Sequence, residues 1–177
     1  MTPKTATLDT SLFVNFYHIG QSRLFDRLEY SLLTTIHVIL ELQGFRTDEI
    51  RKSFSDQLGV RIFRMPLTLD DLVEMANVPF SKQCSDVELS CFVLAARMGA
   101  SVLCDDTRAV RFARRYISFP EVVGTAEILI QAYLLNLVGD ADLKDFSACL
   151  ERHKFRLPFD LCYEAAGRRY LTKPSPE

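Results

Sequence analysis

Acidic side chains follow two short apolar segments that are typical of buried strands. Asp9 comes directly after residues 5–8, and Asp105 and Asp106 come just after residues 100–103. In an open parallel sheet, ligands bind beyond the carboxyl ends of the strands, which share one edge. If both segments are strands of one sheet, these carboxylates converge on a single site.

Two further carboxylates lie in predicted helices beside this edge. Glu88 falls in the first turn of the helix before residues 100–103, and Glu41 falls in the helix after the second predicted strand. Clustered carboxylates repel one another strongly unless a cation lies between them. Oxygen ligands suit hard cations, so the pattern predicts a site for Mg²⁺ or Mn²⁺.

Each acid also has an ordinary structural interpretation. An Asp at a strand end often caps the next helix, Glu88 completes a capping box with Ser85, and Glu41 fits a solvated helix surface. Taken singly, these structural roles are favoured. Taken together, they leave unexplained why so many acids follow or adjoin strand ends.

Strand and helix patterns alternate along the first two thirds of the chain. Strand patterns occupy residues 5–8, 32–36, 60–64, 100–103 and 122–123, and helical patterns occupy residues 11–17, 37–43, 69–76, 85–98 and 108–115. The clearest boundaries are the capping box that opens at Ser85 and the glycines Gly44 and Gly99 that follow helices. Alternation requires crossover connections, which predicts an α/β fold with three layers, α/β/α, around a central, mainly parallel sheet.

The pattern changes after Gly124. Residues 126–137, 143–153 and 159–170 have the pattern of three successive helices with no strand between them. We therefore expect an α/β domain over residues 1–124, a helical C-terminal extension over residues 125–171 that packs on it, and a frayed tail over residues 172–177.

Composition limits the functions open to the chain. Its 177 residues suffice for one compact domain, and its 25% charged and 48% hydrophobic residues exclude a disordered or collagen-like chain. With 21 basic and 23 acidic residues, the net charge is −2, so any surface for nucleic acid must be local. The candidates are a group of four arginines and a second pair: Arg108, Arg111, Arg114, Arg115, Arg168 and Arg169. A solvated helix face is the simpler interpretation of the same group.

Cysteine usage and the N-terminal segment indicate a cytoplasmic protein. The 5 cysteines include no CxxC pair and no spacing to histidine that suits zinc, which favours reduced thiols. The first residues lack the apolar core and cleavage site of a signal peptide. No stretch approaches the roughly 20 apolar residues of a membrane span, so we expect no membrane association.

The ordered acids resemble those of the PIN-domain nucleases, including the VapC-like toxins of bacterial toxin–antitoxin pairs. The resemblance rests on TLDTSLFV, VILELQG, SDVELSCFVLAARMGA and VLCDDTRAVRFAR, and residues 122–166 resemble a helical tail found in one prokaryotic branch of the family. Asp9 has a hydroxyl residue, Ser11, two positions later, and Glu41 stands in an apolar-Glu-Leu-x-Gly context. Glu88 occupies the third position of a helix, eleven residues before Gly99.

The fourth acid in the family follows the next strand, and the second residue of the pair, Asp106, aligns with it. Two departures stand out: Glu at position 88 replaces the commoner Asp, and Cys104 stands where many members carry Thr. The first substitution still supplies a carboxylate for a metal. The second removes any role for a hydroxyl at that place.

The resemblance implies a metal-dependent hydrolase that cuts phosphodiester bonds in single-stranded or structured RNA. It implies that Asp9, Glu88 and Asp106 hold Mg²⁺ or Mn²⁺, with Asp86 and Asp105 as alternative ligands. Glu41 would complete the catalytic set by orienting water or binding a second ion. Ser11, Arg108 and Arg111 would contact RNA phosphates.

Partners and rival functions follow from the same features. The C-terminal helices carry more apolar residues than we expect one sheet to cover, namely Ile128, Leu129, Ala132, Leu135 and Leu143. Together with the resemblance, this predicts a homodimer and an antitoxin protein as a candidate partner. One rival is a catalytically degenerate PIN-fold interaction protein. A phospho-acceptor domain using Asp9 and Asp106 is the weaker rival, because no Lys lies near Val122 or Val123.

Overall fold

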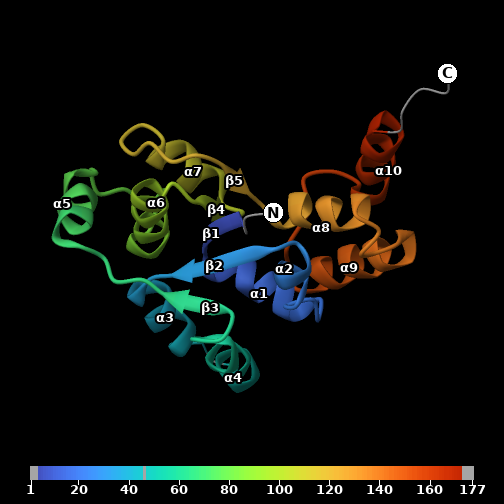
Figure 1. Cartoon of the computed structure of the whole chain (residues 1–177), viewed down its shortest axis with the longest axis horizontal. Coiled ribbons are helices and arrows are strands. Elements are labelled where there is room, and N and C mark those ends of the chain that lie inside the picture. The colour runs from blue at the N-terminus through green and yellow to red at the C-terminus, as the bar shows by residue number, and fades with distance from the viewer. Residues whose placement is uncertain (1–3, 46, 173–177) are drawn as a thin grey trace.

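The computed structural model describes residues 4–45 and 47–172 and contains one five-stranded sheet (Figure 1). Its strands are β1 (Lys4–Leu8), β2 (Tyr30–Thr34), β3 (Ile62–Arg64), β4 (Ser101–Leu103) and β5 (Val122–Val123). They lie in the order β3-β2-β1-β4-β5, and every pair of neighbours is parallel. The predicted α/β fold with a central parallel sheet is confirmed.

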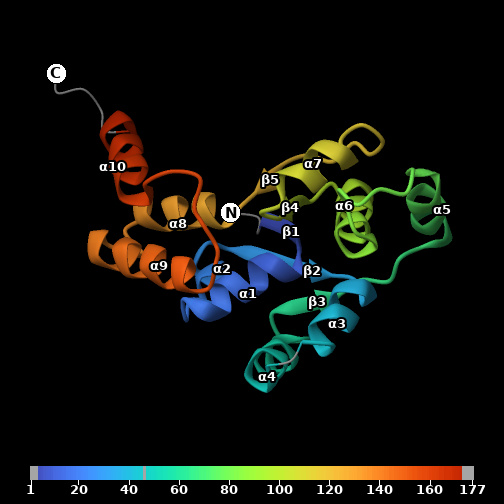
Figure 2. The ribbon, with the colours of Figure 1, turned by 180° about the vertical axis from the view of Figure 1, so that it is seen from behind.

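Ten helices connect and cover these strands in the described part of the chain. In the first part of the chain they are α1 (Thr10–His18), α2 (Leu24–Arg27), α3 (Ile36–Gln43), α4 (Asp48–Gln57), α5 (Leu69–Asn77), α6 (Asp86–Met98) and α7 (Thr107–Ala113). The last three are α8 (Thr125–Leu134), α9 (Asp140–Arg152) and α10 (Leu161–Thr172). Figures 1 and 2 show α5, α6 and α7 toward one end of the molecule and α8, α9 and α10 toward the other. No helix in residues 4–45 and 47–172 is long and apolar enough to cross a membrane.

Alternate residues of the central strands point to opposite faces of the sheet, as strand geometry requires. Leu8 of β1 and Leu103 of β4 belong to a large core that also contains residues of α1 and α8. Val102 belongs to a second core with residues of α6 and α7. Thr7 also faces α6, where its hydroxyl donates to the Cys91 carbonyl at 3.2 Å. The fold therefore has the predicted three layers.

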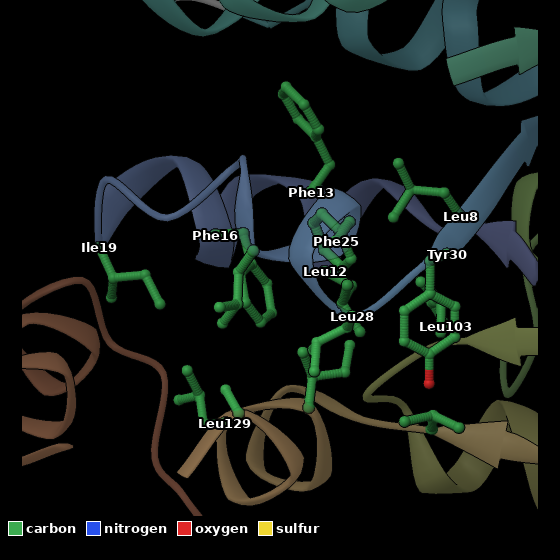
Figure 3. Packing of buried hydrophobic residues seen from close by; sticks show 14 of the residues in the cluster. Leu8, Leu12, Phe13, Phe16, Ile19, Phe25, Leu28, Tyr30, Leu103 and Leu129 are labelled. Carbon is green, nitrogen blue, oxygen red and sulfur yellow. The ribbon is translucent and has the colours of Figure 1, made fainter. Parts of the chain in front are cut away.

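The large core extends from the sheet into the C-terminal helices. Phe16 of α1 and Ile19, which caps the end of α1, belong to the same cluster as Leu129 of α8, as Figure 3 shows. Leu143 and Leu150 of α9 belong to the same cluster and are fully buried. The last three helices therefore share a core with α1 and the sheet.

The prediction that these helices carry more apolar surface than the rest of the fold can cover is wrong. Four of the five residues on which it rested are buried, namely Ile128, Leu129, Ala132 and Leu143. Leu135 is 60% exposed because it lies at the C-terminal end of α8. The sequence pattern missed that α1 and the sheet together cover this face.

Two local differences from the expected elements have clear causes. The strand predicted at residues 32–36 lies instead at Tyr30–Thr34, because the Thr35 side chain caps α3 by accepting from the Val38 amide at 3.4 Å. Helix α4 was not predicted because it buries only Ile50 and Phe54 on an otherwise polar sequence. Residues 173–177 of the predicted tail lie outside the described residues.

The strand order creates a topological switch point between β1 and β4. From β1 the chain continues to β2 and β3 on one side, while β4 and β5 lie on the other. In such sheets the connections diverge at this point and leave a crevice beyond the carboxyl ends of the two strands. The Asp9 amide donates to the Leu103 carbonyl at 3.1 Å, so the two strand ends are joined at this edge.

Candidate active site

Asp9 lies at the switch point and caps α1. Its Oδ2 accepts hydrogen bonds from the Ser11 amide at 3.2 Å and from the Ser11 hydroxyl. The residue is only 4% exposed. Burial raises the pKa of Asp9 to about 6; the bonds from Ser11 lower it, and the negative charge of Glu88 raises it further. Asp9 and Glu88 are therefore electrostatically coupled.

Glu88 reaches the site from the first turn of α6. Its Oε2 accepts from the Ser85 amide at 2.8 Å and from the Ser85 hydroxyl at 2.9 Å. The Ser85 hydroxyl also accepts from the Glu88 amide at 3.2 Å, which confirms the predicted capping box. Gly99 ends the helix in a left-handed conformation with φ of 60°, as predicted for a C-terminal glycine. Glu88 therefore helps to cap α6, and its negative charge also acts on Asp9.

The neighbouring acids Asp105 and Asp106 point to different partners. The Asp105 carboxylate accepts from the Thr125 amide at 2.7 Å, the Thr125 hydroxyl at 2.6 Å and the Asn15 side chain at 3.0 Å. It lies so close to Gly124 that a Cβ at that glycine would be 2.8 Å from Oδ1. Burial raises the pKa of Asp105, and its hydrogen bonds lower it. This carboxylate joins α1 to the start of α8.

Asp106 is the more accessible member of the pair. Its Oδ1 caps α7 by accepting from the amides of Arg108 and Ala109 at 2.8 and 3.1 Å. Its side chain is 35% exposed, and the Arg108 guanidinium lies 3.8 Å from the same oxygen. The geometry therefore favours Asp106 over Asp105 as a ligand for a cation or substrate.

The charges of these acids also act on Cys84, which was not predicted to be a site residue. Burial raises the pKa of its thiol to about 12, with contributions from the negative charges of Glu88, Asp106, Asp86 and Asp9. Four carboxylates from three segments therefore act on the same thiol. In the sequence, the only signal was the position of this cysteine just before Ser85.

The remaining predicted acid, Glu41, belongs to α3. It is exposed in the last turn of α3. Three buried polar atoms have no hydrogen-bond partner among the described residues: the hydroxyl oxygens of Thr10 and Thr34 and Nδ1 of His37.

The arginines divide into two groups with different environments. Arg108 is 78% exposed beside Asp106, and the exposed Arg111 donates from Nε to the Thr107 carbonyl at 3.2 Å. By contrast, Arg168 pairs with Glu127 at 2.7 Å and with Glu164 at 2.9 Å. The first group therefore lies at the acidic edge, while Arg168 joins α10 to α8.

The carboxylates of this site suit a hard divalent cation, but they do not already surround a position for one. Within residues 4–45 and 47–172, no three His, Cys, Asp or Glu side chains form a ready-made metal site. Asp9, Glu88 and Asp106 each take their side-chain hydrogen bonds on a single oxygen, Oδ2, Oε2 and Oδ1 respectively. The second oxygen of each is the one that a cation would bind.

A parallel sheet with carboxylates at its switch point defines an α/β protein with an acidic candidate site. The family model described as PIN domain (DUF3368) matches residues 5–168. The chain belongs to this PIN-domain family, which confirms the resemblance seen in the sequence and indicates a nuclease. No curated protein matches the chain.

Among solved structures, the chain is similar to a chain of the VapBC2 complex from Rickettsia felis bound to a DNA fragment from their promoter. The identity is 14% and the TM-score is 0.48. The match covers 68% of this chain and 98% of the other.

Proposed function

We propose that this protein is a divalent-metal-dependent ribonuclease that cleaves phosphodiester bonds in single-stranded or structured RNA. The observation that supports the proposal is the position of Asp9 and Asp106 directly after the neighbouring strands β1 and β4, with the negative charge of Glu88 acting on Asp9. Membership of the PIN-domain family supports the nuclease class.

Asp9, Glu88 and Asp106 would hold Mg²⁺ or Mn²⁺, with Asp86 and Asp105 as alternative ligands. When bound, the ion supplies Lewis-acid chemistry by activating water and neutralising charge on the phosphate. Asp9 presents a carboxylate whose charge is disfavoured by burial, so it gains most from a bound cation. Ser11 would donate its hydroxyl to a phosphate oxygen after releasing Asp9, and Arg108 and Arg111 would contact phosphates at the rim.

Cleavage of single-stranded RNA by the purified chain tests this proposal. We expect cleavage with Mg²⁺ or Mn²⁺, none with EDTA, and a loss of at least about 100-fold in Asp9→Asn. Asp70→Asn is the matched control, because Asp70 is an exposed acid of α5 away from the site. Undiminished cleavage in EDTA would refute the metal-dependent mechanism.

We propose further that the protein acts as the toxin of a toxin–antitoxin pair and forms a homodimer. Expression of the wild-type chain alone would then slow growth, whereas Asp9→Asn would not. Equal growth of the two strains would refute the toxin role. Light scattering at tens of micromolar tests the dimer, and a monomer mass would contradict it.

A catalytically degenerate interaction protein is the second candidate, and the exposed apolar side chains around α5 favour it. Phe80 is 95% exposed, Leu69 76% and Val73 51%. A protein of this kind would show neither cleavage nor a rise in thermal stability with Mn²⁺. A ligand that binds only the folded state raises that stability by mass action.

A further inference from the structure

A cavity of about 630 Å³ opens beside the acidic edge. Asp105 and Thr107, which flank Asp106 in the sequence, both line it. The opposite wall comes from residues 153–160, which join α9 to α10, and includes Phe155 and Phe159. The cavity therefore lies where the chain passes from β5 into α8, next to the segment that carries Asp106.

The cavity combines flat apolar groups with cationic ones. Phe159 is 40% exposed, and Phe155 is partly buried against the large core. Arg111 from α7 and Arg156 from the loop also line it, and both side chains are exposed. Arg156 makes no hydrogen bond or ion pair with the described residues. Arg168 lines the wall as well, but its guanidinium is bound to Glu127 and Glu164.

These groups match the chemistry of a nucleotide. Aromatic rings stack on nucleobases, and guanidinium groups bind phosphate with paired hydrogen bonds. The volume falls within the usual range for small-ligand sites, which are mostly apolar with a few placed polar groups. Because Asp105 and Thr107 form part of the wall, a nucleotide held here would lie next to the chain segment that carries Asp106.

We propose that this cavity binds one nucleotide of the RNA next to the cleaved phosphodiester. Its base stacks on Phe159, and its phosphate contacts Arg156 and Arg111. The inference rests on the proposed function of the adjacent acidic site, because it names a substrate subsite of that enzyme.

Binding of a fluorescently labelled, short single-stranded RNA to the full chain tests the subsite. Fluorescence polarisation is measured in EDTA with Asp9→Asn as the parent, so that cleavage does not interfere. Adding Phe159→Ala should weaken binding by about 10-fold or more, as expected for a lost base–aromatic stack. Adding Arg156→Gln should reduce the slope of log K against log salt concentration by about 0.7, as expected for one lost phosphate contact on a single strand.

Tyr163→Ala is the matched control, because Tyr163 is an 82% exposed aromatic residue of α10 that does not line the cavity. It should leave the RNA affinity unchanged. Thermal melting of each variant verifies folding, and Arg156→Gln decides the question if Phe159→Ala does not fold. RNA affinity and salt slope equal to those of the parent in both cavity variants would overturn the proposal.

The failure of the subsite and the failure of the proposed function give different results. RNA binding that depends on Phe159, in a wild-type chain that never cleaves with Mn²⁺, would refute the enzyme and retain the nucleotide site. Metal-dependent cleavage, together with RNA affinity that substitutions of Phe159 and Arg156 leave unchanged, would support the enzyme and refute the nucleotide site.

Discussion

The buried carboxyl group of Asp9 should make the metal-free protein less stable at neutral pH than in mild acid. Burial raises its pKa from 3.8 to about 6, with Glu88 adding to the effect. The folded chain therefore holds this proton more tightly than the unfolded chain does. The stabilising contribution of the protonated group is complete below the unfolded pKa and is lost as the pH rises toward 6.

The substitution Asp9→Asn removes this pH-dependent cost. Asparagine keeps the size of the side chain and an oxygen that can accept from Ser11. One pKa unit is worth about 1.4 kcal/mol. The free energy of unfolding of the variant should therefore exceed that of wild type by about 3 kcal/mol near pH 7.5. The gain should fall by about half near pH 5. For a chain of this size, the larger gain corresponds to a rise in Tm of about 6–12 °C.

Thermal and denaturant unfolding in EDTA at both pH values measures the effect, with the exposed Asp70→Asn as control. Wild type and Asp9→Asn with equal stability near pH 7.5, or a gap that does not shrink in acid, would refute the reasoning from burial. Addition of Mn²⁺ should then stabilise wild type and leave Asp9→Asn unchanged, because the variant lacks one of the proposed ligands.

Three further predictions address individual residues and the C-terminal helices. Glu88→Gln should abolish RNA cleavage while Asp86→Asn reduces it only mildly, and the reverse result would reassign the third acid. Asp105→Ala should destabilise the fold by about 3 kcal/mol or more in denaturant unfolding, because donors from Thr125 and Asn15 lose their acceptor. A fragment of residues 1–124 should show no cooperative thermal transition, because Ile128, Leu129 and Ile130 are fully buried in the core that contains Phe16; a cooperative transition would instead mark residue 124 as a true domain boundary.

The sequence predicted those features that depend on neighbouring residues. The capping box of Ser85 and Glu88, the glycine after α6 and the strand at Val122–Val123 all lie where the local pattern indicated. The parallel sheet followed from the alternation of strands and helices. That alternation also placed Asp9 and Asp106 at one edge, because parallel strands share their carboxyl ends.

Features that depend on distant residues could not be predicted in the same way. The orientation of Asp105 is set by Asn15 and Thr125, which lie 90 residues before it and 20 after it. The covering of the apolar residues of α8 depends on how α1 packs against it. The cavity beside Asp106 forms only when the loop before α10 folds back near the start of α7. None of these contacts produces a periodic pattern of residues in the sequence.

The structural and the chemical interpretations of the acids are compatible, because capping is what positions them. Asp9, Glu88 and Asp106 each bind backbone amides at the start of a helix, α1, α6 or α7. The positive end of a helix dipole stabilises a carboxylate there, which offsets part of the repulsion among the three. Burial is the main cause of the raised pKa of Asp9 and Cys84, and the negative charges of the neighbouring acids raise both further. The fold therefore holds these three carboxylates at helix starts, at a cost in free energy that the proposed divalent cation would partly offset.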